Sequence, residues 1–171
     1  MTACVAPITV AALMGVLETI AKFVGSPAAR QRQVGDAVAR CYAATVQNSR
    51  RLHQLAERAP NTASAAGLSE LAASEEAVSA RLLEALKAAA RSAPAIEEAP
   101  ESATAPSHWG RLVQALEAQR RLVQTLREHT AEFAESFAAT AQLFDELRAV
   151  ESMHCERLRA LIARADPQAM N

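Results

Sequence analysis

The C-terminal part of the chain holds the feature that most restricts its fold, because no glycine or proline occurs between Arg111 and Asp166. Large apolar side chains recur along this stretch at alternating spacings of three and four residues, which is the heptad pattern of a coiled coil. A single helix of this length would extend about 85 Å at 1.5 Å per residue. We therefore predict one long coiled-coil helix over residues 108–166.

The preceding half of the chain contains shorter amphipathic patterns. Residues 1–25 predict a short N-terminal amphipathic helix, residues 26–92 a helical hairpin, and residues 93–107, rich in proline and glutamate, an exposed loop. About a quarter of the chain is alanine, the strongest helix former. The expected fold class is all-α: an elongated helical bundle with a long C-terminal coiled-coil helix.

Breaker and capping residues set the expected ends of the hairpin helices. Ser26 is a suitable N-cap and Pro27 suits the first position of the helix that follows. Pro60 and Asn61, with the small residues that continue to Gly67, predict the turn between the two helices. The second helix of the hairpin is expected to begin at about Leu68.

Composition and motifs exclude several classes of function. The chain has 18 Lys and Arg against 19 Asp and Glu, so it lacks the strongly basic character of proteins that bind nucleic acid. The three cysteines form no Cys-x-x-Cys pair, and free thiols are expected. No nucleophile elbow or phosphate-binding glycine loop is present, so we expect neither an enzyme nor a cofactor. The N-terminal helix lacks a polar face rich in Lys and Arg, so we expect it to pack on protein without inserting into a membrane.

Three polar residues occupy positions on the apolar seam of the C-terminal stretch: Gln119, Glu151 and His154. Glu151 and His154 form a Glu-x-x-His pair of the kind that ferritin-like di-iron bundles use twice. A weak internal similarity aligns Glu75 with Glu151 but Val78 with His154. Two carboxylates and one imidazole are too few for two metal ions. We therefore expect no metal and interpret the three seam residues as a polar layer that fixes helix register.

The predicted helices differ in length, and this difference bears on partners. Hairpin helices of about 30 residues would span about 45 Å and leave part of the longer helix uncovered. Because an exposed apolar seam marks an interaction surface, we expect helices of other protein chains to cover it. Replacing Phe137 with alanine is then expected to cost about 3 kcal/mol or more of bundle or complex stability. The residues expected to pack against partners are Leu116, Val123, Leu126, Phe133, Phe137, Phe144, Leu147, Leu158 and Leu161.

The order and lengths of these segments resemble the dynactin subunit 3 family, the smallest subunit of the dynactin shoulder. The matching pieces are Leu17 to Gly25, SPAARQRQVGDAV (26–38), the helix to Pro60, GLSELAASEEAVSARLLEAL (67–86), HWGRL (108–112) and the run to Leu161. The resemblance implies a non-enzymatic structural subunit that stabilises the junction of shoulder and projecting arm, with dynamitin and the large arm subunit as partners. It also implies a cytoplasmic, cytoskeleton-associated protein that supports dynein-driven transport along microtubules.

Two alternatives remain open at this stage. One is a degenerate ferritin-like four-helix bundle with at most a partial metal site, which requires the long helix to fold back near 135–141. The other is a coiled-coil scaffold unrelated to motors.

Two arginine pairs and three further histidines have no assigned role in these alternatives. Arg50-Arg51 and Arg120-Arg121 could contact an acidic partner, but a solvated helix face is the preferred explanation for both pairs. The histidines outside the seam show no metal-ligand spacing and are expected at the surface or at helix caps; they are His53, His108 and His129.

Overall fold

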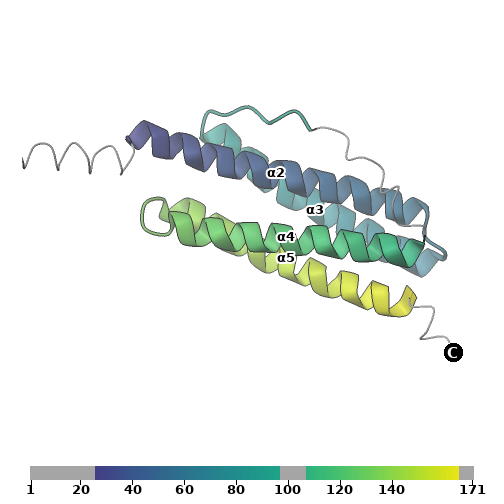
Figure 1. Cartoon of the computed structure of the whole chain (residues 1–171). Helices are drawn as coiled ribbons and strands as arrows, with labels where there is room; N and C mark the ends of the chain where they lie inside the picture. Colours follow the sequence, from purple (N-terminus) through teal and green to yellow (C-terminus); the bar gives the residue numbers. More distant parts are fainter. Residues whose placement is uncertain (1–25, 97–106, 166–171) are drawn as a thin grey trace, which may run out of the picture. The chain divides into compact units, whose positions relative to one another are not determined.

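The computed structural model describes residues 26–96 and 107–165, and these ranges contain helices but no strand. The helices are α2 (Pro27–Glu57), α3 (Thr62–Ala88), α4 (His108–Phe133) and α5 (Ala138–Ala165) (Figure 1). From Gly35 onward the chain forms one compact unit, whereas the first turns of α2, up to Val34, group with a separate unit. The prediction of an all-α bundle is confirmed. The predicted helix at 1–25 lies outside the described residues.

Within the compact unit, neighbouring helices run antiparallel. α2 and α3 form the predicted hairpin, in which the Ser49 hydroxyl donates to the carbonyl of Ala72 at 3.3 Å. α4 and α5 form a second hairpin and lie side by side (Figure 1). The bundle therefore consists of two helical hairpins packed against each other.

Side-chain contacts show how the two hairpins pack. Arg81 on α3 pairs with Glu146 on α5 at 2.5 Å, and Asn48 on α2 donates to Gln119 on α4 at 3.0 Å. α3 consequently faces α5 and α2 faces α4, while α3 and α4 run in the same direction on opposite corners. Residues 89–107 connect these two parallel helices, and this connection is much longer than the turns within each hairpin.

The prediction of one continuous helix over 108–166 is wrong. The chain leaves the helix after Phe133 and re-enters it at Ala138, although no glycine or proline lies between them. Folding back brings aromatic side chains of α4 and α5 together. The ring centroids of Phe133 and Phe144 lie at a distance of 6.1 Å. Burial of the apolar stripe by the chain itself outweighs the lost helical hydrogen bonds, because tertiary packing dominates helix stability.

The predicted start of α2 is confirmed, but that of α3 is not. The Ser26 hydroxyl accepts from the Ala29 amide at 3.2 Å, as expected for an N-cap that precedes Pro27. α3 begins at Thr62, earlier than expected, because the Asn61 side chain caps it by accepting from the Ser64 amide at 2.8 Å. Gly67 therefore lies inside the helix, where a Cβ atom would stand 3.4 Å from Leu161.

The C-terminus of α3 contains a backbone feature that yields a stability prediction. The amide of Arg91 donates to the carbonyl of Leu86, and the amide of Ala90 to that of Lys87, which is the Schellman pattern. Ala90 has φ 53°, a left-handed conformation that glycine adopts without steric penalty. We expect Ala90→Gly to raise the free energy of unfolding by about 1 kcal/mol. Urea denaturation checks this expectation, with Ala88→Gly, two residues earlier at the last helical position of α3, as the destabilising control.

The bundle core is apolar on both sides of a polar centre. The buried cluster at one end includes Leu52, Leu71, Leu112 and Leu158, one from each helix. Cys41 and Cys155 are buried free thiols, as expected for the cysteines within the described residues. The exception to this apolar core is a layer of polar side chains midway along the bundle, and that layer is the candidate site.

Candidate metal centre in the bundle core

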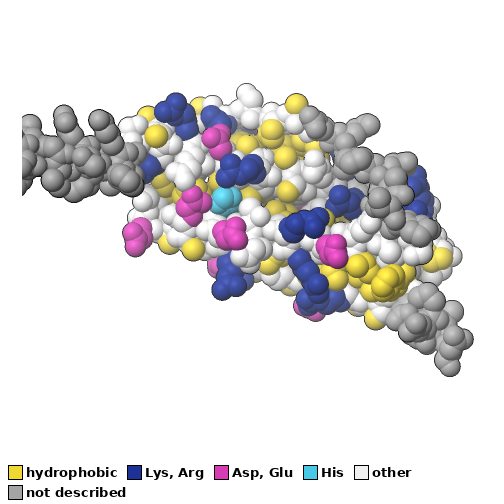
Figure 2. Space-filling view, in the orientation of Figure 1, with side chains coloured by type: hydrophobic (Ala, Val, Ile, Leu, Met, Phe, Trp, Pro, Cys, Tyr) yellow, Lys and Arg dark blue, Asp and Glu magenta, His cyan; other side chains and the backbone are white. Residues whose placement is uncertain are grey.

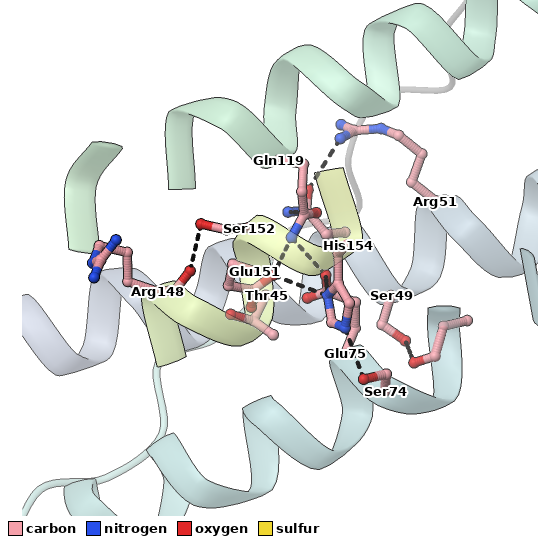
Figure 3. A network of polar contacts seen from close by, with 12 residues as sticks. Thr45, Ser49, Arg51, Ser74, Glu75, Gln119, Arg148, Glu151, Ser152 and His154 are labelled. Carbon is pink, nitrogen blue, oxygen red and sulfur yellow. Dashed lines mark hydrogen bonds and ion pairs between the residues drawn. The ribbon is translucent and has the colours of Figure 1, made fainter. Parts of the chain in front are cut away.

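Each helix contributes a polar side chain to one buried layer. Asn48 comes from α2, Glu75 from α3, Gln119 from α4, and Glu151 and His154 from α5. Both glutamates are 0% exposed and His154 is 3% exposed. Figure 3 shows Glu75, Glu151 and His154 pointing toward one another, with Gln119 reaching into the same centre. The heptad spacing of α5 brings Glu151 and His154 to the same side of the helix, one turn apart.

Hydrogen bonds join the layer across three helices. His154 donates from Nδ1 to Glu75 Oε1 at 2.8 Å and to Glu151 Oε2 at 3.1 Å. Gln119 donates from Nε2 to Glu75 Oε1 at 2.8 Å and also to Glu151 Oε2. Two N–H donors thus lie between two buried carboxylates, which is the arrangement that buried charged groups require.

Outer contacts hold the two donors in place. Ser74 lies on the far side of the imidazole, with its hydroxyl 2.7 Å from His154 Nε2. Asn48 donates from Nδ2 to Gln119 Oε1 at 3.0 Å and so fixes the orientation of that amide. Because Ser74 occupies Nε2, the Nδ1 atom of His154 is the ring nitrogen directed at the carboxylates.

The buried layer shifts the pKa values of its ionisable groups. Burial raises the pKa of Glu151 to about 7, although the hydrogen bond from His154 opposes this and the nearby Glu75 adds to it. Burial by itself would lower the pKa of His154, but the hydrogen bonds to Glu151 and Glu75 outweigh it and raise the pKa to about 9. The layer therefore holds an imidazolium between two carboxyl groups at neutral pH.

The same atoms form a potential ligand set for a cation. One ligand atom from each of Glu75, Glu151 and His154 lies within 4.8 Å of the others. Glu75 Oε2 and Glu151 Oε1 are buried and have no hydrogen-bond partner. A buried carboxylate oxygen without a partner carries a desolvation cost that a bound cation would remove. The centre can thus offer two carboxylates and one imidazole to a single ion.

The structure places the polar residues of the predicted seam layer together and adds two others. Gln119, Glu151 and His154 converge as a layer with Glu75 and Asn48. Sequence reasoning left Glu75 and Asn48 out of this layer. The signal for both was present, because each is a polar residue at a core position of its own amphipathic helix.

The residues predicted to pack against partners lie mostly inside the bundle. All of them are buried except Val123 and Phe137, which are half-buried. Phe144 and Leu147, both 0% exposed, face the interior of their own chain. The seam therefore needs no foreign helix to cover it, because α4 and α5 cover each other and the first hairpin covers the rest.

The other histidines lie in three different environments. His53 is exposed and pairs with Glu76 at 2.9 Å, and His108 is half-buried at the start of α4. His129, expected at the surface or at a cap, is instead buried between aromatic rings, 5.4 Å from the Phe144 centroid. Its apolar surroundings arise from the fold-back of α5, which the prediction of one continuous helix did not contain.

Comparison with known proteins does not assign the chain to a family. No protein-family model matches the sequence, and no curated protein matches it either. The resemblance to dynactin subunit 3 therefore stays a prediction. Among the described residues, no helix has the length and apolar character needed to cross a membrane.

Proposed function

We propose that this chain is a metal-binding four-helix bundle that holds one divalent ion between Glu75, Glu151 and His154. The observation that carries the proposal is the convergence of these ligand atoms within 4.8 Å at a buried centre. Isolated carboxylates are expensive to bury, and two of them facing each other need positive charge between them. In the metal-bound form, the ion takes the place of the proton on His154 Nδ1.

The donor set indicates the class of ion. Imidazole combined with carboxylates suits first-row transition ions such as Zn²⁺ or Fe²⁺, whereas Ca²⁺ and Mg²⁺ prefer oxygen ligands alone. Three protein ligands would leave coordination positions open for water or another small ligand. Ser74 then accepts the Nε2 proton of His154, which is the usual second contact of a metal-binding histidine.

The connectivity of the helices supports the same proposal. Two antiparallel hairpins joined by one long crossover between parallel helices is the arrangement of ferritin-like bundles, which bind metals between facing helices. The ferritin-like alternative required the predicted long helix to fold back near 135–141, and α4 ends at Phe133. Compared with the di-iron pattern, Val78 stands where a second histidine would be, and Asn48 and Gln119 replace carboxylates. The remaining donors suffice for one ion.

Metal titration of the purified protein tests the function directly. We expect Zn²⁺ to bind at one site per chain, measured by competition with a chromophoric chelator. Glu75→Gln preserves the shape of the side chain and removes its charge. It is expected to weaken Zn²⁺ binding by about 100-fold or more. Loss of a residue that only supports a ligand lowers metal affinity by about 10–100-fold, and loss of a ligand itself should lower it more. Co²⁺ substitution adds a visible spectrum that reports the nitrogen and oxygen ligands.

Glu76→Gln is the matched control, because Glu76 is the next residue on α3 and its side chain is 61% exposed. It pairs with His53, so the control also measures any weak surface binding there. Equal loss of Zn²⁺ binding in both variants would refute the buried site. Absence of Zn²⁺ binding by the wild type, with loss of stability in Glu75→Gln, would assign the layer a purely structural role.

The role of a dynactin subunit rests on the sequence resemblance alone. Its physical premise was a seam too long for the chain to cover, whereas the chain buries Phe144, Leu147 and Leu158 against its own helices. A partner would have to bind the outside of the bundle or open it. Co-purification of dynamitin with the tagged chain from its own cells would support that role.

A further inference from the structure

A basic pocket opens between α2 and α4, outside the metal centre. Its volume is about 390 Å³, and it is lined by Arg40, Arg51 and Arg121 together with the polar side chains of Gln47, Asn48 and Thr125. None of the described residues that line it is acidic. Figure 2 shows dark blue side chains over the middle of α2 and α4 on this face. The chain as a whole has a net charge of −1, so this positive charge is a local feature.

Some arginines elsewhere in the bundle have carboxylate partners. Arg81, Arg148 and Arg159 each pair with a carboxylate. Within the described residues, Arg40, Arg51 and Arg121 form no such pair. A group of guanidinium ions without carboxylates is unfavourable unless an anion binds among them.

Arg51 is the best-positioned of the three. It is half-buried, and its Nη1 donates to Asn48 Oδ1 at 3.3 Å. Asn48 in turn donates to Gln119, so the contact that orients Arg51 is anchored in the buried polar layer. Burial lowers the pKa of Arg51, and the positive charge of Arg121 lowers it further. Arg51 and Arg121, one from each helix, line the same pocket and can therefore contact the same ligand.

We propose that this pocket binds the phosphate group of a small soluble molecule, held by Arg51 and Arg121. Guanidinium groups match tetrahedral oxyanions through paired N–H donors, and two of them balance a dianion. Arg40 adds charge, while Gln47 and Thr125 supply neutral donors for the rest of the ligand. The volume lies within the range of small-molecule sites. This inference does not rest on the proposed metal-binding function.

The remaining side chain of chemical interest in the pocket does not alter this assignment. Cys41 also lines the pocket, and burial raises the pKa of its thiol to about 12. The thiol therefore stays protonated and neither repels an anion nor acts as a nucleophile. The pocket is a binding site, and its residues provide no group-transfer chemistry.

Isothermal titration with inorganic phosphate, at constant ionic strength in chloride buffer, tests the inference. The wild type is expected to bind one phosphate per chain, and Arg51→Gln and Arg121→Gln are each expected to weaken binding by about 10-fold or more. Arg157→Gln on α5 is the control, since Arg157 is exposed, lies outside the pocket and carries the same charge. It should change the affinity by less than about 2-fold, because salt screens distant charges.

The source of the phosphate group is distinguished by two further probes. Glycerol 3-phosphate, a soluble monoester, is expected to bind with the same dependence on Arg51 and Arg121. The proposal would be overturned in favour of a membrane surface if neither soluble probe binds and the protein is retained only by vesicles that contain phosphatidic acid. Equal weakening in all three variants would also overturn it, because a diffuse charge effect would then explain the binding.

Discussion

Replacing His154 with leucine is expected to lower the free energy of unfolding by about 3–5 kcal/mol at pH 8, measured by urea denaturation without metal. The variant keeps most of the side-chain volume but removes the positive charge between Glu75 and Glu151, which are both fully buried. Two carboxylates then face each other with Gln119 as their remaining shared donor. The loss should be smaller at pH 5, because Glu151 can accept a proton there.

The pH dependence of the wild type follows from the same layer. The pKa of Glu151 is raised from 4.5 to about 7, and that of His154 from 6.5 to about 9. In both ranges the folded chain binds more protons than the unfolded chain, so stability falls as pH rises from about 5 to about 9. The thiol of Cys41, near Glu151, has a pKa of about 12 and stays neutral throughout this range.

Two controls separate this layer from general effects. In His154→Leu a decline in stability with rising pH should remain, because Glu151 still titrates and has lost the hydrogen bond from His154 that lowers its pKa. Met153→Leu changes the neighbouring residue, which is 58% exposed, and should alter stability by less than about 0.5 kcal/mol. A wild-type stability that rises with pH across this range, in the presence of EDTA, would contradict the assignment of an imidazolium between two carboxyl groups.

Much of this layer was present in the sequence pattern. Gln119, Glu151 and His154 stood out because polar residues at seam positions are rare enough to be noticed. The alignment of Glu75 with Glu151 is also visible in the sequence, but two amphipathic helices of similar composition can align in this way without any contact between them. What the sequence did not contain is the way the helices pack, which places α3 beside α5 and thereby brings Glu75 to His154.

The fold-back between α4 and α5 was beyond local sequence rules. Residues 134–137 read Ala-Glu-Ser-Phe and include neither glycine nor proline, so the helical periodicity runs through them. The turn is stabilised by contacts between residues on different helices, chiefly the rings of Phe133 and Phe144. Such long-range burial is invisible to a reading of one helix at a time.

The arginine pocket shows a similar limit. The pairs Arg50-Arg51 and Arg120-Arg121 were recognised, but a solvated helix face explained each pair separately. Packing α2 against α4 brings one member of each pair, Arg51 and Arg121, to the same pocket. Their shared surroundings depend on helix orientation, which periodicity alone does not determine.

Replacing Phe144 with alanine is expected to lower the free energy of unfolding by about 3–5 kcal/mol, the range for a fully buried phenylalanine. Phe144 is 0% exposed and contacts the rings of His129 and Phe133 on α4. Phe137→Ala is the internal comparison. Phe137 is half-buried in the turn, so its loss should be about 1 kcal/mol, smaller than its seam position alone would indicate. Thermal and urea denaturation of both variants measure the difference.

A double-mutant cycle between Phe133→Leu and Phe144→Leu makes this prediction a test of the fold-back itself. In one continuous helix these residues would lie about 17 Å apart along the axis, since they are eleven positions apart at 1.5 Å per residue. Distant sites of that kind add independently. In the bundle their ring centroids are 6.1 Å apart, and aromatic pairs at this distance couple by about 0.5–1.5 kcal/mol. If the two losses of unfolding free energy are strictly additive, the result favours one continuous helix. Coupling in this range requires α5 to fold back along α4.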